Sequence, residues 1–168
     1  MLKVLEWIDR MVAVILRPVV FAGMIALAAV ITLQIVSRVF FTSFAWTEEV
    51  ARFLLIWIAF LGAALAFQQG RHIAVTFVRD LMPLNLRRII TGAGILVAIA
   101  FLVTLAMIGW KYSGIQSFQK SPSLRISMFW VYLVMPASAA IMTFLSVVDL
   151  VRLLAGRDAR GHMQEDFE

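Results

Sequence analysis

The chain contains no cysteine among its 168 residues. A structural disulfide, a thiolate metal site and a thiol redox centre are therefore excluded. Histidine is nearly as scarce, because only His72 and His162 are present and neither lies in a long apolar run. A four-helix membrane cytochrome needs histidine pairs inside its bundle to ligate haem, so this pattern argues against that function. We expect no metal and no cofactor.

The usual catalytic motifs are also missing. No HExxH metalloprotease motif, Gly-rich phosphate loop or Gly-x-Ser-x-Gly elbow is present. The long apolar runs contain no obvious paired acids that could act as a general acid and base. The sequence therefore predicts a protein that is not an enzyme.

Charge is sparse: 15% of the residues are charged and 62% are hydrophobic, with a mean hydropathy of +0.94. One small soluble domain cannot hide so much apolar surface. Spanning about 30 Å of hydrocarbon takes roughly 20 apolar residues in a helix. The alternation of a membrane barrel is absent. We predict an all-α domain over residues 1–155, followed by a polar, disordered cytoplasmic tail over 156–168, with four transmembrane helices at about 18–36, 50–67, 89–110 and 126–148.

The spans should be flanked by interfacial helices. Residues 2–16 have an apolar and a charged face, which predicts an amphipathic helix in the headgroup plane, with Pro18 starting the first span at its N1 position. A simple extension of that span fits as well. No small-residue cleavage site follows, so we expect the first span to be retained. A second interfacial helix, ended by Pro83, is predicted between the second and third spans.

Ends and bends of the last helix can also be predicted. Ser121 and Pro122 have the residue types of an N-cap and N1 pair for the fourth helix. Pro136 lies inside that helix and should bend it. Asp149 and Arg152 are three residues apart, which favours an interfacial ion pair.

The basic residues are distributed unevenly between the two sides of the predicted spans. Ten of the 15 lysines and arginines precede the first span, join the second to the third, or follow the fourth, and five lie at the opposite ends of the spans. Loops rich in lysine and arginine stay in the cytoplasm. Both termini should therefore face the cytoplasm.

Three charges stand at the start of the second span. Thr47 can cap this helix, which places Glu48 and Glu49 in its first turn, where the helix dipole favours acids, and Arg52 is a neighbour of both. A coupling carboxylate of a transporter would lie near mid-membrane. Two interpretations stay open, namely capping with headgroup anchoring, and a specific ion-pair contact with a partner subunit.

Small residues recur along the second span every four positions, at Gly62, Ala66 and Gly70. In lipid, such small-xxx-small faces mark the places where helix backbones approach closely. The helix packed against this face can belong to this chain or to another chain.

Several stretches together resemble the small membrane subunit of tripartite ATP-independent periplasmic (TRAP) transporters. They are QIVSRVFF, WTEEVARFLLIWIAFLGAALAF, GRHIAVTFV and SLRISMFWVYLVMP, which cover most of residues 34–136 in the expected order. An acid often follows the segment that matches HIAV in this family, whereas this chain has Thr76. A general need for that carboxylate is therefore doubtful here.

The resemblance implies partners and a role. The partners would be a large multi-span subunit, which binds substrate and sodium, and a soluble periplasmic substrate-binding protein; membrane lipid surrounds the chain, and no nucleic acid is involved. The small subunit would brace the large one in a bacterial inner membrane during sodium-coupled uptake of an organic acid such as a dicarboxylate, a keto acid or a sialic acid. The motif positions that would serve folding or subunit contact are Trp46, Glu48, Glu49, Arg52, Gly62, Gly70 and His72.

Two other function classes are weighed against this one. A self-sufficient, homodimeric small transporter would need an essential ionisable group in a span, and only Arg52 and Asp149 come near. A four-helix membrane enzyme would need a nucleophile with a base, which the sequence does not offer.

Overall fold

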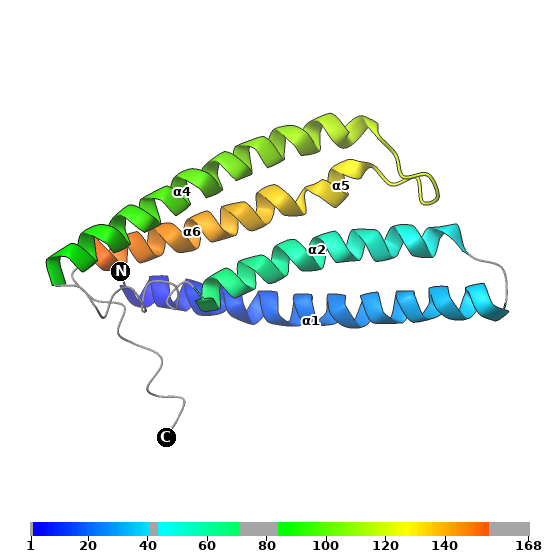
Figure 1. Ribbon diagram of the computed structural model, residues 1–168, viewed down its shortest axis with the longest axis horizontal. Helices are drawn as coiled ribbons and strands as arrows, with labels where there is room; N and C mark the ends of the chain where they lie inside the picture. The colour runs from blue at the N-terminus through cyan, green and yellow to red at the C-terminus, as the bar shows by residue number, and fades with distance from the viewer. Residues whose placement is uncertain (1, 41–43, 71–83, 155–168) are drawn as a thin grey trace, which may run out of the picture.

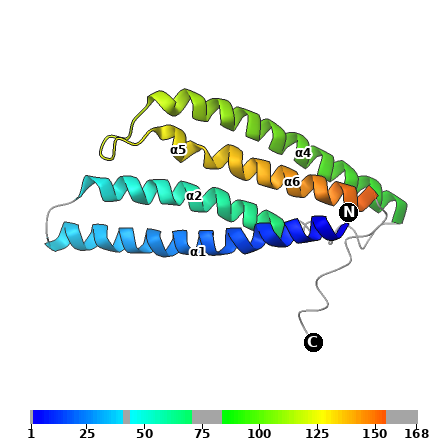
Figure 2. The same ribbon diagram turned by 180° about the vertical axis from the view of Figure 1, so that it is seen from behind.

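The computed structural model describes residues 2–40, 44–70 and 84–154. Four long helices run side by side, and consecutive long helices run in opposite directions (Figure 1; Figure 2 shows the reverse side). They are α1 (Leu2–Phe40), α2 (Ala45–Gly70), α4 (Leu84–Ile115) and α6 (Val134–Leu154). Two short helices, η1 (Gln116–Phe118) and α5 (Met128–Tyr132), lie between α4 and α6. The described residues form no β-strand beyond one isolated bridge.

The prediction of four helices able to span a membrane is confirmed. The helical segments long and apolar enough to cross a bilayer are Arg10–Phe40, Ala45–Gln69, Ile89–Phe118 and Met128–Leu154. Neighbouring helices pack in the order α1, α2, α6, α4, so α6 lies between two partners. Helix α2 also has two partners, but the last span is the most enclosed of the four and contributes buried Val134, Leu145 and Val148.

Helix α1 is longer than one span requires. Its 39 residues extend for about 58 Å, nearly twice the thickness of the hydrocarbon core. Pro18 lies inside this helix, so its prediction as the N1 residue of a separate span is wrong, and the alternative of a continuous extension is observed. Near the membrane surface, water or headgroups can bond the backbone carbonyl that a proline leaves without a partner.

The start of the last span also differs from the prediction. Ser121 and Pro122 precede the helix instead of starting it, because the helix begins at Met128 with Ser127 as its N-cap. The Ser127 hydroxyl accepts a hydrogen bond from the Phe129 N–H at 3.4 Å. The cap at Ser121 is wrong because that hydroxyl bonds a side chain from another helix, described below.

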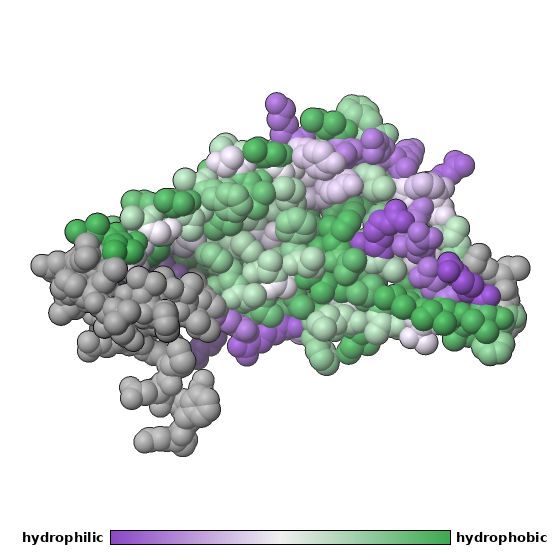
Figure 3. Space-filling model, viewed as in Figure 1, coloured by the Kyte–Doolittle hydropathy of each residue, from purple (hydrophilic) through white to green (hydrophobic). Residues whose placement is uncertain are grey.

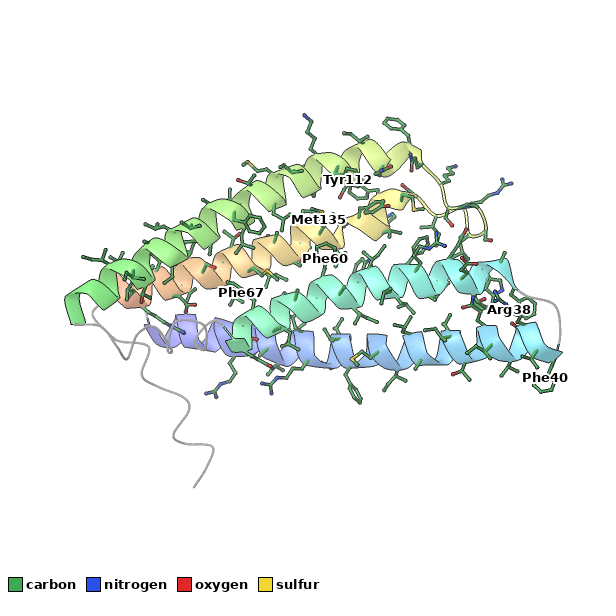
Figure 4. The ribbon with its side chains drawn as sticks, in the orientation of Figure 1. Arg38, Phe40, Phe60, Phe67, Tyr112 and Met135 are labelled. Atoms are coloured by element: carbon green, nitrogen blue, oxygen red, sulfur yellow. The ribbon has the colours of Figure 1, made fainter. Side chains whose placement is uncertain are left out.

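The predicted effect of Pro136 is seen as an interruption. Helix α5 ends at Tyr132 and α6 begins at Val134, with Leu133 between them in a turn. Proline has no N–H to donate to the carbonyl four residues earlier, which belongs to Tyr132, and its ring displaces that carbonyl. The ring of Tyr132 makes an edge-on contact with Tyr112 of α4, at a centroid distance of 5.2 Å. Figure 4 labels Tyr112 on α4.

Two smaller predictions have different outcomes. Asp149 and Arg152 form the predicted ion pair, at 3.6 Å between Oδ1 and Nη1. The interfacial helix between the second and third spans, His72 and the polar tail lie outside the described residues.

Close packing of α4 against α6 depends on Gly109. A Cβ at this position would lie 3.2 Å from Pro136 Cδ and 3.3 Å from Met135 Cγ. At Gly94, on the same helix, a Cβ would meet nothing within 4 Å. The two glycines therefore differ in how much side chain their surroundings accept.

We predict that Gly109→Leu lowers the stability of the purified chain, because overpacking costs about 1–3 kcal/mol. Gly94→Leu is the matched control, since it brings the same gain in helix propensity without the overlap. Thermal unfolding in detergent, followed by circular dichroism, should give a lower Tm for Gly109→Leu than for Gly94→Leu. Equal Tm values for the two variants would contradict the tight α4–α6 contact.

Candidate assembly site at the start of the second span

Glu48 and Glu49 are adjacent in sequence but have different environments. Successive residues of a helix point about 100° apart, so one side chain can face outward while the next faces inward. Glu48 faces outward: its Oε1 accepts a hydrogen bond from Arg52 Nη2 at 3.0 Å, and both side chains are more than 60% exposed. Exposed pairs at this spacing contribute roughly 0.5 kcal/mol or less. The predicted neighbour relation of Glu48 and Arg52 is therefore an ion pair on the surface.

Glu49 faces inward and is only 9% exposed. Its Oε1 accepts the Ser123 N–H at 2.8 Å, and its Oε2 accepts the Leu124 N–H at 3.1 Å. Oε2 also accepts the Ser121 hydroxyl. We call these three residues the Glu49 cradle. Successive backbone N–H groups form a small anion-binding nest, and here the anion is a side chain of the same chain.

The cradle belongs to a short connection between α4 and α5 that bonds to itself. The Ser121 N–H donates to the Ile126 carbonyl at 2.9 Å, and the Arg125 N–H donates to the Ser121 carbonyl at 3.0 Å. Arg125 has a φ of 53°, in the left-handed region that is uncommon for residues other than glycine. This tight turn aims the N–H groups of Ser123 and Leu124 at Glu49. The carboxylate thus links the start of α2 to a segment more than 70 residues away in sequence.

The predicted cap at Thr47 is wrong. Helix α2 begins at Ala45, three residues earlier than a Thr47 cap requires. Thr47 is fully buried, and its hydroxyl donates to the Phe44 carbonyl at 2.7 Å instead of accepting a backbone N–H. The side chain therefore fixes the turn that leads into the helix.

Three of the other predicted contact residues are not closely covered by the rest of this chain. Trp46 is exposed beside Phe44, at a ring centroid distance of 6.3 Å. A Cβ at Gly62 would meet nothing within 4 Å, and Ala66 is exposed. Gly70 ends α2, and His72 lies outside the described residues. A role for these residues in partner contact stays a prediction.

Much of the remaining surface of the helices is apolar. Large side chains are exposed on α1 and on α4, including Phe21, Val97, Phe101 and Trp110. Figure 3 shows this apolar surface over the middle of the bundle, with most hydrophilic groups toward the end that carries the start of α2 and a smaller patch over the first half of α1. Lipid or another membrane protein can cover such a surface. Among the described residues, no group of three or more histidine, aspartate or glutamate side chains could hold a metal ion.

Sequence reasoning missed the three cradle residues. The residue type of Ser121 predicts an N-cap of the fourth helix. Ser123 and Leu124 bind Glu49 through their backbone N–H groups, which the identity of a side chain does not indicate. One signal could have indicated this contact: WTEE and SLRIS both belong to the stretches that resemble one family. The structure places these two segments in contact.

We predict that Glu49→Gln loosens the connection that holds the cradle. One carboxylate oxygen becomes an NH₂ group, which cannot accept a hydrogen bond, so at least one cradle donor loses its partner. Hydrogen exchange measured by mass spectrometry should become faster in peptides covering residues 119–127. Glu48→Gln removes the neighbouring charge without touching the cradle and should leave this exchange unchanged. Identical exchange in Glu49→Gln and the unmodified chain would refute the assignment.

Comparison with known proteins places this geometry in a family. Residues 27–156 match the family described as tripartite ATP-independent periplasmic transporters, DctQ component. The match includes the start of α2, the cradle and all of the last span.

Individual relatives agree with the family match. The chain is 31% identical over 166 residues to the isethionate TRAP transporter permease protein DctMQ of Oleidesulfovibrio alaskensis, covering 92% of this chain but only 25% of that protein. It is 27% identical over 137 residues to the sialic acid TRAP transporter small permease protein SiaQ of Vibrio cholerae, covering 79% of each. It is 24% identical over 163 residues to the ectoine TRAP transporter small permease protein TeaB of Halomonas elongata, covering 92% of this chain and 82% of that protein. This multi-pass membrane protein belongs to the DctQ family of small TRAP transporter permease subunits.

Proposed function

We propose that this chain is a non-catalytic subunit that braces the large transport subunit of a sodium-coupled importer for organic acids in a bacterial inner membrane. The proposal rests on the observation that this chain uses buried polar groups for bonds within its own fold. The buried carboxylate of Glu49 bonds the chain's own connection, and wide apolar surfaces face outward. A subunit built in this way offers contact area to a neighbour.

Hydroxyl groups within the spans support the same reading. Thr32, Thr104 and Thr143 each donate to the backbone carbonyl four residues earlier in their own helix, at 2.7–2.8 Å. Ser113 does the same toward Gly109 at 2.8 Å. A hydroxyl whose proton is engaged by its own helix cannot donate it to a solute.

The relatives support a large permease as the partner. In DctMQ, the region similar to this chain is a quarter of one longer permease protein. A separate small subunit would meet the same neighbour across an interface between chains. The names of the three relatives mention isethionate, sialic acid and ectoine, although each relative is similar to this same chain. We therefore place substrate selection in the large subunit and the periplasmic binding protein.

Orientation follows from the basic residues. The end that carries the start of α1, the end of α2, the start of α4 and the end of α6 is the arginine-rich one, which we place in the cytoplasm (Figure 1). The end with the Glu49 cradle then faces the periplasm, on the side from which a soluble binding protein delivers substrate.

The competing function, a self-sufficient homodimeric transporter, would need a free ionisable group in a span. Both candidates have a local ionic partner near a helix end, because Arg52 pairs with Glu48 and Asp149 pairs with Arg152. These pairs favour the bracing role over the homodimeric transporter.

The proposed function predicts that deleting this chain abolishes uptake without affecting substrate binding. Radiolabelled substrate uptake should fall to the background level in cells that still make the large subunit and the binding protein. Substrate affinity of the purified binding protein, measured by calorimetry, should be unchanged. Uptake that survives the deletion would refute the bracing role, and gradient-driven flux by the purified chain alone in liposomes would favour the homodimeric transporter.

A second prediction concerns the exposed ion pair. Arg52→Glu replaces the partner of Glu48 and puts three acids within about one helical turn, which should weaken assembly with the large subunit by about tenfold if Arg52 lies in the interface. Lys111→Glu is the matched control, since it makes the same charge change at an exposed position near the same end of the bundle. Insertion of either variant into the membrane should stay normal. Equal co-purification yields for Arg52→Glu and the unmodified chain would show that the site serves only capping and anchoring.

A further inference from the structure

A groove runs along the surface where α1 meets α2. It has a volume of about 480 Å³, and its walls come from Arg17, Pro18, Val20, Phe21, Met24 and Leu65. Apart from the Arg17 guanidinium, these side chains are apolar. The groove is therefore an open, largely apolar depression of the surface that carries one cationic group.

We place Arg17 at the membrane boundary, because it directly precedes the long apolar run that the sequence predicts as the first span. The predicted span begins at residue 18, and Arg17, Phe21 and Met24 follow the i, i+4, i+7 spacing of one helix face. Phe21 and Met24 are 67% and 56% exposed. With Arg17 at headgroup depth, these two side chains point into the hydrocarbon of the same membrane leaflet.

No carboxylate among the described side chains pairs with Arg17. Arg10 lies two helical turns earlier on the same face, about 10 Å away along the axis, and is exposed. Figure 3 shows a hydrophilic patch over the first half of α1, with apolar surface beyond it toward the middle of the helix. Along α1 this face is first basic and then apolar. The same order, charged headgroups followed by hydrocarbon, is found in one leaflet of a bilayer.

From this arrangement we infer that the groove binds an anionic phospholipid, with its phosphate on Arg17 and one acyl chain along Phe21 and Met24. A guanidinium forms paired hydrogen bonds with phosphate oxygens, and basic sites between transmembrane helices recognise anionic headgroups. The apolar walls favour a lipid over a soluble phosphate. This inference is independent of the transport role, because the groove lies within one chain.

Native mass spectrometry of the full chain in detergent can test the site with phosphatidylglycerol and phosphatidylcholine of identical acyl chains. Phosphatidylglycerol should bind roughly fivefold more tightly, which is the contribution expected of one arginine at a headgroup. Arg17→Gln should remove this preference, and the matched control Lys111→Gln should keep it. Excess glycerol phosphate should not displace the lipid.

Four results would overturn the inference. The first is equal binding of the two lipids to the unmodified chain, which requires no variant. The second is an unchanged preference in Arg17→Gln, and the third is displacement of the lipid by glycerol phosphate, which would indicate a soluble anion as the ligand. The chain in complex with its large subunit should also retain phosphatidylglycerol in the same measurement. Loss of the lipid there would show that the partner covers the groove, and it is the fourth result that would contradict the inference.

Discussion

The hydrocarbon of the bilayer is the constraint on which the rest of this structure depends. A polar group in lipid must be bonded within the protein or lie at the membrane surface. Threonine and serine hydroxyls in the spans donate to carbonyls of their own helices, and the charged side chains Glu48, Arg52, Asp149 and Arg152 form pairs near helix ends. What remains in the middle of the membrane is apolar surface.

Because lipid supplies little force to drive helices together, contacts between them need close packing or specific bonds. The pair α4 and α6 has close packing at Gly109. At the opposite side of the bundle, Gly23 of α1 lies close to Ile58 of α2. The Glu49 cradle adds a specific bond between these two helix pairs, since it ties the start of α2 to the connection that leads from α4 into α5.

The sequence was sufficient for features that depend on local properties alone. The four spans follow from runs of apolar residues and the Asp149–Arg152 pair from its spacing. The missing N–H of Pro136 predicts a bend, and the structure has an interruption of the helix at that place. It was insufficient at helix ends. Thr47 and Ser121 both have the residue type of a cap, but one hydroxyl bonds the Phe44 carbonyl and the other bonds Glu49. Such bonds depend on which segments the fold brings together, and adjacent glutamates give no indication of which one will face inward.

A brace and a transporter place their polar groups differently. A transporter keeps ionisable or polar groups free for its solute, whereas the hydroxyl groups and charged pairs named above bond within this chain. The most direct test is a structure of the assembled transporter, determined by electron cryomicroscopy with substrate and sodium present. Our account predicts that density for substrate and sodium lies entirely within the large subunit. Density for either one, enclosed by side chains of this chain between its own helices, would contradict it.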